Sequence, residues 1–138
     1  MNIDSIKNGI VIDHIQAGKA MQIYSMLNLD ELDCSVAIIK NAPSHQMGRK
    51  DIIKIDSNID VNMDVLGFVS PNITVNIIRD DEIIEKRHIE LPEKLVDILK
   101  CKNPRCITTT EQGIQHIFRL SDPENKVYRC IYCDTKAE

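Results

Sequence analysis

Aromatic residues are scarce in this chain of 138 residues, which has three tyrosines, two phenylalanines and no tryptophan. Proteins that bind single-stranded nucleic acid usually stack bases on aromatic side chains, and five aromatic residues are few for such a surface. A formal net charge of −4 also leaves no strongly basic half of the chain. The composition therefore gives little support to nucleic-acid binding.

Long apolar runs are missing as well. No run approaches the roughly 18 residues that a membrane-spanning helix requires. The first residues, "MNIDSIKNGIVIDHI", show neither the basic segment nor the small-residue cleavage site of a secretory signal. With 43% hydrophobic and 28% charged residues, the composition is that of an ordinary globular domain. We expect a cytoplasmic protein that does not associate with membranes.

Sequence signatures of catalysis and of the common nucleotide-binding folds are also absent. The chain has neither the glycine-rich dinucleotide motif nor a P-loop, so a nucleotide site here would be of another kind. No serine lies in a nucleophile elbow. The histidines do not have metalloprotease spacing; they are His14, His45, His88 and His116. A binding or regulatory role is favoured over an enzyme.

Cysteine is infrequent but unevenly placed. Of five cysteines, four form two close pairs: "CKNPRC" holds Cys101 and Cys106, and "CIYC" holds Cys130 and Cys133. In a reducing compartment such pairs bind metal more often than they form disulfides. Four thiolates suit tetrahedral zinc and leave no open position for a reactive water, so the pattern predicts one structural Zn²⁺. The fifth, Cys34, lies in an apolar stretch and is predicted to be a small buried hydrophobe.

The segment that carries the cysteine pairs is short. Residues 100–138 contain 7 basic and 5 acidic residues, so four thiolates and a divalent ion bring the segment to about neutral. A module of this size buries too little apolar surface to fold without an additional cross-link, and a bound metal ion supplies one. Zinc ribbons bind nucleic acid or protein; the near-neutral charge favours protein. A nucleic-acid-binding zinc ribbon attached to an α+β dimerisation domain remains the alternative.

The first ninety residues alternate between strand and helix patterns. Strands are expected at 9–15, 35–40, 49–55, 72–79 and 82–90, and helices at 17–29 and 60–70. The second helix is expected to start from Asp60 as its N-cap and to end before Pro71. This order predicts an α+β fold, a ferredoxin-like antiparallel sheet with two helices on one face.

The rest of the chain is expected to form a small all-β zinc ribbon. Residues 91–100 have Pro92 at their second position, where the start of a helix tolerates proline, and we interpret them as a linking helical turn. Residues 113–120 and 126–130 then form a hairpin that brings the second cysteine pair back to the first. We expect a domain boundary between residues 95 and 96.

Basic residues interrupt the acidic N-terminal part at two strands. The alternation of residues 49–55 places Lys50, Ile52 and Lys54 on one face of the sheet, with Asp51, Ile53 and Ile55 on the core face. Lys86 and Arg87 on the last strand add positive charge. Such a face is suited to hold phosphates over an apolar floor, but on these residues alone a solvated sheet surface is the more common explanation. Nucleotide hydrolysis at this face is a further, weaker possibility.

Taken together, these fragments resemble the family of aspartate carbamoyltransferase regulatory chains. The resemblance is carried by "VIDHI", "MGRKDIIKI", "TVNII" and "LPE" in that order, followed by the spacing of the two cysteine pairs. It covers nearly the whole chain. It implies a domain over residues 1–95 that binds the nucleotide effectors CTP and ATP and pairs with a second copy of itself. A zinc domain over residues 96–138 would dock on the catalytic chain of the enzyme.

The resemblance also implies roles for individual residues. Asp13, His14, Lys54 and Lys86 match family positions that hold the ribose, base and phosphates of the effector. Around them the family pattern places Lys50, Ile52, Val11, Asn76, Ile83 and Ile6. Asn103 matches a residue of the first zinc turn that faces the catalytic chain, and Arg105 is expected beside it.

Overall fold

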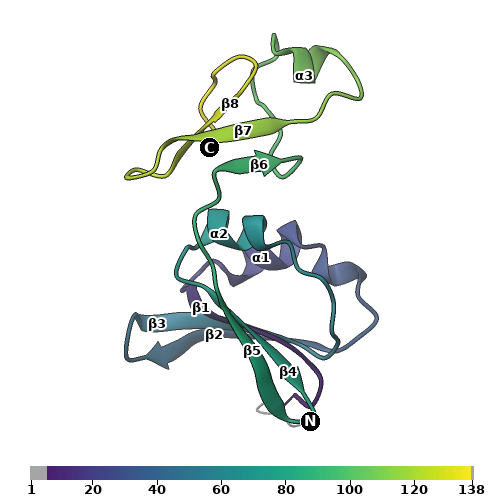
Figure 1. Ribbon diagram of the computed structural model, residues 1–138, viewed down its shortest axis with the longest axis vertical. Coiled ribbons are helices and arrows are strands. Elements are labelled where there is room, and N and C mark those ends of the chain that lie inside the picture. The colour runs from purple at the N-terminus through teal and green to yellow at the C-terminus, as the bar shows by residue number, and fades with distance from the viewer. Residues whose placement is uncertain (1–5, 138) are drawn as a thin grey trace. The chain divides into compact units, whose positions relative to one another are not determined.

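The computed structural model describes residues 6–137, and its contacts divide the chain into two units, Met1–Glu90 and Leu91–Glu138 (Figure 1). None of its helices within the described residues is long and apolar enough to cross a membrane.

The N-terminal unit is built on a five-stranded antiparallel sheet with the strand order β2-β3-β1-β4-β5. Helices α1 and α2 lie on one side of it (Figure 1), as the predicted ferredoxin-like arrangement requires. The α+β prediction is confirmed. The strands are β1 (Gly9–Gln16), β2 (Val36–Ser44), β3 (Gly48–Ile55), β4 (Thr74–Arg79) and β5 (Glu82–His88), and the helices are α1 (Ala20–Met26), the 3-10 turn η1 (Leu29–Glu31) and α2 (Met63–Val69).

The core of this unit lies between the sheet and its helices. Aliphatic side chains of the three central strands pack there against Ala20 and Ile23 of α1 and Leu66 of α2. Each fully buried aliphatic side chain stabilises the fold by about 1.5–3 kcal/mol. The strand residues are Ile10, Ile12, Ile15, Ile53, Ile55 and Val75. The other face of the sheet is therefore left for polar side chains.

An irregularity in β1 decides which side chains reach that second face. The pairing of β1 with β3 shifts register between Ile12 and Ile15, and His14 has a left-handed φ of 58°. A bulge of this kind adds a residue to one strand, so the alternation of faces slips by one. Ile12 and Ile15 are both fully buried, whereas Asp13 and His14 are only half-buried. The bulge therefore presents both of these side chains on the face away from the helices.

The carboxylate of Asp51 in β3 holds the segments around this bulge. It is fully buried, on the core face as the alternation predicts. Its two oxygens accept hydrogen bonds from the backbone N–H groups of Gly18 and Ala20, at 3.0 and 3.2 Å, and of Asn41, at 3.0 Å. Asn41 lies in a second bulge, in β2. One side chain thus fastens the start of α1 and the kink of β2 to the central sheet.

The helices differ in detail from the prediction. The segment predicted as one helix over 17–29 forms the seven-residue α1, and Asn28 with φ of 54° then turns the chain into η1. The N-cap of α2 is Asn62, so the prediction of Asp60 is wrong. The side-chain oxygen of Asn62 accepts from the N–H groups of Asp64 and Val65. An Asn at the N-cap satisfies donors that a helix start otherwise leaves unpaired.

The C-terminal unit is a three-stranded antiparallel sheet in the order β6-β7-β8. Its strands are β6 (Lys94–Val96), β7 (Ile117–Asp122) and β8 (Val127–Cys130), and its one-turn helix is α3 (Ile107–Thr110). Phe118 and Tyr128 are almost fully buried in it, and the Tyr128 hydroxyl donates to the Pro92 carbonyl at 2.6 Å. The predicted hairpin is thus present, as β7 and β8.

The linking helical turn predicted over 91–100 is wrong, because part of this segment is strand β6. Leu95 is fully buried between exposed Lys94 and Val96, which is the period of a strand, and it pairs with Phe118 of β7. The boundary expected between residues 95 and 96 falls inside this strand. The contacts divide the chain after Glu90 instead, because β6 belongs to the C-terminal sheet.

Candidate metal centre and effector face

The two cysteine pairs come together in the C-terminal unit. The Sγ atoms of Cys101, Cys106, Cys130 and Cys133 all lie within 4.8 Å of one another. Two of the separations are 3.5 Å, between Cys101 and Cys133, and 3.7 Å, between Cys106 and Cys130. None of the chain's five cysteines, all of which are described, forms a disulfide.

Two tight turns aim the thiols at a common point. In the first turn the N–H of Cys106 donates to the carbonyl of Asn103 at 3.1 Å. In the second, the N–H of Asp134 donates to the carbonyl of Cys130, and the N–H of Cys130 donates to Thr135, both at 2.9 Å. The short spacings of the sequence make such turns possible, and the β7–β8 hairpin brings them together.

The cluster fits a tetrahedral metal ion. A metal–sulfur distance of about 2.3 Å in a tetrahedron implies sulfur–sulfur separations of about 3.8 Å, close to the separations observed here. Four soft thiolate donors favour zinc or iron over magnesium or calcium. Because all four positions are cysteines, the site has no place for a metal-bound water, so its chemistry is that of a structural centre.

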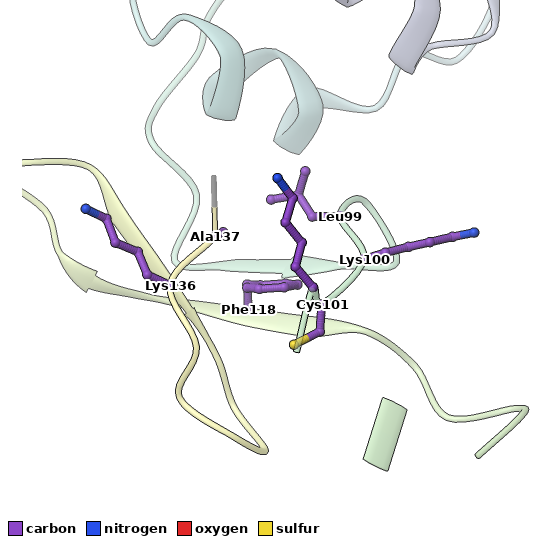
Figure 2. Close-up of a pocket in the computed structure, with 7 residues that line it drawn as sticks. Leu99, Lys100, Cys101, Phe118, Lys136 and Ala137 are labelled. Atoms are coloured by element: carbon purple, nitrogen blue, oxygen red, sulfur yellow. The ribbon is translucent and has the colours of Figure 1, made fainter. Parts of the chain in front are cut away.

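Apolar side chains shield one side of this centre. Cys101 and Phe118 line the same hollow of about 300 Å³. Figure 2 shows the ring of Phe118 next to Cys101, with the side chains of Lys100 and Lys136 extending away in opposite directions. Three lysines line this hollow together with Leu99 and Ala137; they are Lys100, Lys102 and Lys136.

The thiols differ in how firmly they hold their protons. Burial raises the pKa of Cys101 to about 12 and also raises the pKa of Cys130. The hydrogen bond with the Thr135 hydroxyl lowers the pKa of Cys133 to about 6. Metal must therefore displace protons from Cys101 and Cys130, whereas Cys133 is largely ionised at neutral pH without metal.

Metal affinity is expected to rise steeply with pH. Cys101 and Cys130 stay protonated between pH 7 and 8 in the metal-free chain, because their pKa values are raised, and a bound ion requires both as thiolates. Each displaced proton changes the apparent affinity about tenfold per pH unit, so we expect at least about a hundredfold weaker binding at pH 7 than at pH 8. Competition with a chromophoric chelator measures this. An affinity independent of pH in this range would contradict it.

The turns of the metal centre also present exposed side chains. Arg105 is exposed, as its predicted partner contact requires. Asn103 mainly serves its own turn, because its side-chain oxygen accepts from the N–H of Arg105 at 3.0 Å. Sequence reasoning missed a group of exposed apolar residues that flank the cysteines; these are Ile107, Ile131 and Tyr132. The sequence signal that could have identified them is their position directly beside the metal-binding cysteines.

In the N-terminal unit, four of the predicted effector residues form one row across the sheet. Lys54 of β3 pairs with Val11 of β1, Val11 pairs with Asn76 of β4, and Asn76 pairs with Lys86 of β5. Directly paired residues of antiparallel strands point to the same face. Three strand spacings of about 4.8 Å separate the two lysine backbones by about 14 Å. The row thus carries a cation at each end and an amide between them.

A second row lies two residues further along the strands. Asp13 pairs with Thr74, and Thr74 pairs with His88. His14 reaches the same place, because its Nδ1 lies 2.9 Å from the Thr74 hydroxyl. Lys50 forms an ion pair with Asp13 at 3.0 Å, with the two side chains only 17% and 19% exposed. The bulge in β1 is what allows Asp13 and His14 to share this row.

Two further features belong to this part of the unit. The side-chain oxygen of Asn76 is buried and has no hydrogen-bond partner among the described residues, which is unusual for a buried polar atom. Separately, a mostly polar cavity of about 310 Å³ has two of the predicted residues, His14 and Lys86, in its walls, whereas Asn76 is not one of its lining residues. The lining residues are His14, Gln46, Met47, Asn72, Thr74, Lys86 and His88.

The remaining predicted effector residues lie at the margins of this face. Ile52 is between Lys50 and Lys54 on β3 and half-buried, as the alternation predicts. Ile83 pairs with Ile78 at the far end of β5 and is 60% exposed. Ile6 is half-buried near Gly9. Sequence reasoning did not select Thr74 and His88, because only the strand register shows that Thr74 pairs with Asp13 and that His88 pairs with Thr74.

Comparisons with known proteins agree with this architecture. Residues 1–90 match the family "Aspartate carbamoyltransferase regulatory chain, allosteric domain", and residues 93–138 match "Aspartate carbamoyltransferase regulatory chain, metal binding domain". Curated relatives named aspartate carbamoyltransferase regulatory chain include one from Clostridium botulinum, 52% identical over 134 residues, which are 97% of this chain and 92% of the relative. A relative from Clostridium tetani is 51% identical over 97% of this chain and 94% of its own length. One from Bifidobacterium longum is 45% identical over 100% and 99%.

Proposed function

Because the chain belongs to the family of aspartate carbamoyltransferase regulatory chains, we propose that it binds CTP and ATP on its N-terminal sheet and transmits their effect to a catalytic chain. The family is one of non-catalytic subunits with an allosteric and a metal-binding domain, in agreement with the two units of this chain. The family matches and the relatives confirm the resemblance to this family that the sequence motifs indicate. We expect the chain to act in the cytoplasm.

The cross-strand row of Lys54, Val11, Asn76 and Lys86 is the observation that carries the effector proposal. The two ammonium groups at its ends are carried on long flexible side chains that can turn inward along the row, which suits the phosphates of a nucleoside triphosphate. The apolar Val11 between them offers a floor for the sugar or base. The Asn76 oxygen, which lacks a partner among the described residues, suits an amino group of the base.

Asp13 and its neighbours complete the proposed site. A carboxylate is the acceptor that commonly binds ribose hydroxyls, and Asp13 lies one row away from the two lysines. Lys50, which now pairs with Asp13 at 3.0 Å, is close enough to the row to turn toward a phosphate. Ile52, Ile83 and Ile6 supply apolar margins.

Regulation then needs only a difference in affinity. CTP and ATP would compete for this one site and stabilise different quaternary states of the holoenzyme. A coupling free energy of about 1–3 kcal/mol between the effector site and the catalytic site is sufficient. The chain itself carries out no chemistry; the catalytic chains condense carbamoyl phosphate with aspartate.

The C-terminal unit is proposed to hold one structural Zn²⁺ and to dock on the catalytic chain. Tyrosine and arginine are enriched among the residues that contribute most to protein interfaces, and exposed Tyr132 and Arg105 lie on the two metal-binding turns. Exposed Ile107 and Ile131 add apolar area beside them. Asn103 holds the first of these turns in shape, and we propose that it contributes to the contact by fixing the position of Arg105.

Pairing of two copies is proposed for the N-terminal unit. Every residue of the edge strand β5 is exposed, including Ile83 and Ile84 at 60% and 51%. A long exposed edge strand with apolar side chains is normally covered by another chain. We therefore expect a dimer of this chain within the assembly.

Calorimetric titration of the full chain with CTP tests the effector site. Lys54→Ala and Lys86→Ala each remove a charged contact to phosphate, worth about 1.5–3 kcal/mol. We expect dissociation constants roughly ten- to a hundredfold higher than that of the wild type. Lys94→Ala, at an exposed lysine of the other unit, is the matched control and should bind as the wild type does. Absence of CTP binding, or wild-type binding by both variants, would show that the site is wrongly assigned.

A further inference from the structure

Each metal-binding turn carries a threonine two residues after its second cysteine. The first turn reads Cys106-Ile107-Thr108, and the second reads Cys133-Asp134-Thr135. In both, the threonine hydroxyl lies against the sulfur of the cysteine two residues before it. The Oγ1–Sγ separations are 3.1 Å for Thr108 with Cys106 and 3.2 Å for Thr135 with Cys133. While the sulfurs are thiols, Cys133 donates to the Thr135 hydroxyl, and either atom can donate in the first pair. The two turns thus share a contact that the cysteine spacing alone does not require.

Thr108 is buried, so its hydroxyl needs a hydrogen-bond partner within the protein. The residue is only 5% exposed, and its recorded side-chain contact is the one with Cys106. Its neighbours on α3 are used differently: the Thr109 hydroxyl donates to the Asn103 carbonyl at 2.8 Å, and Thr110 is exposed. A buried hydroxyl without a partner is costly, so the contact with sulfur is what satisfies this side chain.

The charge of the metal-bound centre gives these contacts a function. Four thiolates around a divalent ion carry a net charge of −2, and three of the four cysteines are buried. A thiolate has no hydrogen to donate, so in the metal-bound centre each threonine hydroxyl must be the donor and the sulfur the acceptor. Hydrogen bonds to a charged acceptor are stronger than those between neutral groups, and they also fix the direction of the sulfur lone pairs.

We propose that Thr108 and Thr135 are positioning residues of the metal centre, each donating a hydrogen bond to one thiolate of its own turn and thereby slowing the loss of the metal. One hydroxyl acts on each cysteine pair, so the two turns are secured independently. The inference rests on the metal-binding role of the C-terminal unit and is independent of the effector site.

Metal release from the full chain tests this proposal. Thr108→Val and Thr135→Val remove the hydroxyl and nearly keep the volume of the side chain. Zn²⁺-loaded protein is mixed with excess chromophoric chelator, and we expect about ten- to a hundredfold faster transfer from each variant. In Co²⁺-loaded protein, the sulfur-to-cobalt charge-transfer bands should move to lower energy, because the thiolate loses a donor. Thr110→Val is the matched control, and Thr108→Ser and Thr135→Ser should restore both readouts.

The outcomes separate a hydrogen-bonding role from a packing role. Faster release with shifted cobalt bands in the valine variants, and wild-type behaviour in the serine variants, supports the proposal. Wild-type release and unshifted bands in both valine variants overturn it. Faster release with unshifted bands, or serine variants as fast as the valine variants, also overturns it, because packing alone then explains the effect. Thr135 is only half-buried, so its variant keeps the test decisive if Thr108→Val fails to fold.

Discussion

Replacing Cys130 with serine is expected to unfold the C-terminal unit while the N-terminal unit stays folded. The unit Leu91–Glu138 has few large buried side chains, chiefly Leu95, Phe118 and Tyr128. A structural metal contributes about 10 kcal/mol to the folding of such a module, more than the net stability that a core of this size supplies. Metal content by mass spectrometry and amide hydrogen exchange of each unit measure the result.

Cys34→Ser is the matched control for this experiment, because Cys34 is half-buried beside the core of the other unit and lies outside the cluster. It should keep the metal and the exchange protection of residues 91–137. Protection in the C-terminal unit that survives Cys130→Ser together with complete loss of metal would show that the unit folds without an ion.

Comparing Cys130→Ser with surface variants separates folding of the C-terminal unit from its docking on the catalytic chain. A chain with an unfolded C-terminal unit should no longer co-purify with the catalytic chain. Arg105→Ala and Tyr132→Ala, at exposed positions, should keep the metal but co-purify less, since they remove proposed contacts without touching the ligands. Undiminished co-purification of Cys130→Ser would place the contact elsewhere in the chain.

Asp51→Ala is expected to have the largest effect on the N-terminal unit. The substitution leaves the N–H groups of Gly18, Ala20 and Asn41 without their acceptor, and the N–H of Ala20 is fully buried. Each buried donor left unsatisfied costs about 1–3 kcal/mol, and the two outer ones are partly reached by water, so we expect a loss of about 3–5 kcal/mol. Urea unfolding, followed by hydrogen exchange of residues in β1 and β3, measures the free energy of unfolding.

Asp56→Ala serves as the control for Asp51→Ala, because Asp56 directly follows β3 and is exposed. Its effect should lie within about 0.5 kcal/mol of zero. A loss below about 1 kcal/mol for Asp51→Ala would mean that these backbone groups find water or other acceptors, and that the two bulges do not depend on this carboxylate.

Much of the site could be predicted from local pattern. Lys50, Ile52 and Lys54 lie on one face of β3 because alternation follows from the pleat of a single strand. Each cysteine pair sits in a turn only a few residues long, and the predicted hairpin between Cys106 and Cys130 brings the two pairs together. By contrast, residues 91–100 were mistaken for a helical turn, since the apolar Leu95 and Val96 fit either period until the partner strand is known.

By itself, the sequence determined the order of the five strands and two α-helices in the N-terminal unit, the four metal ligands and the core side of β3, because each depends on neighbours within a few residues. The tertiary structure alone decided that Lys54, Val11, Asn76 and Lys86 share one row. It also decided that a bulge turns His14 to the face of Asp13. Register and bulges are set by hydrogen bonds between strands far apart in the chain, and no local pattern of side chains carries that information.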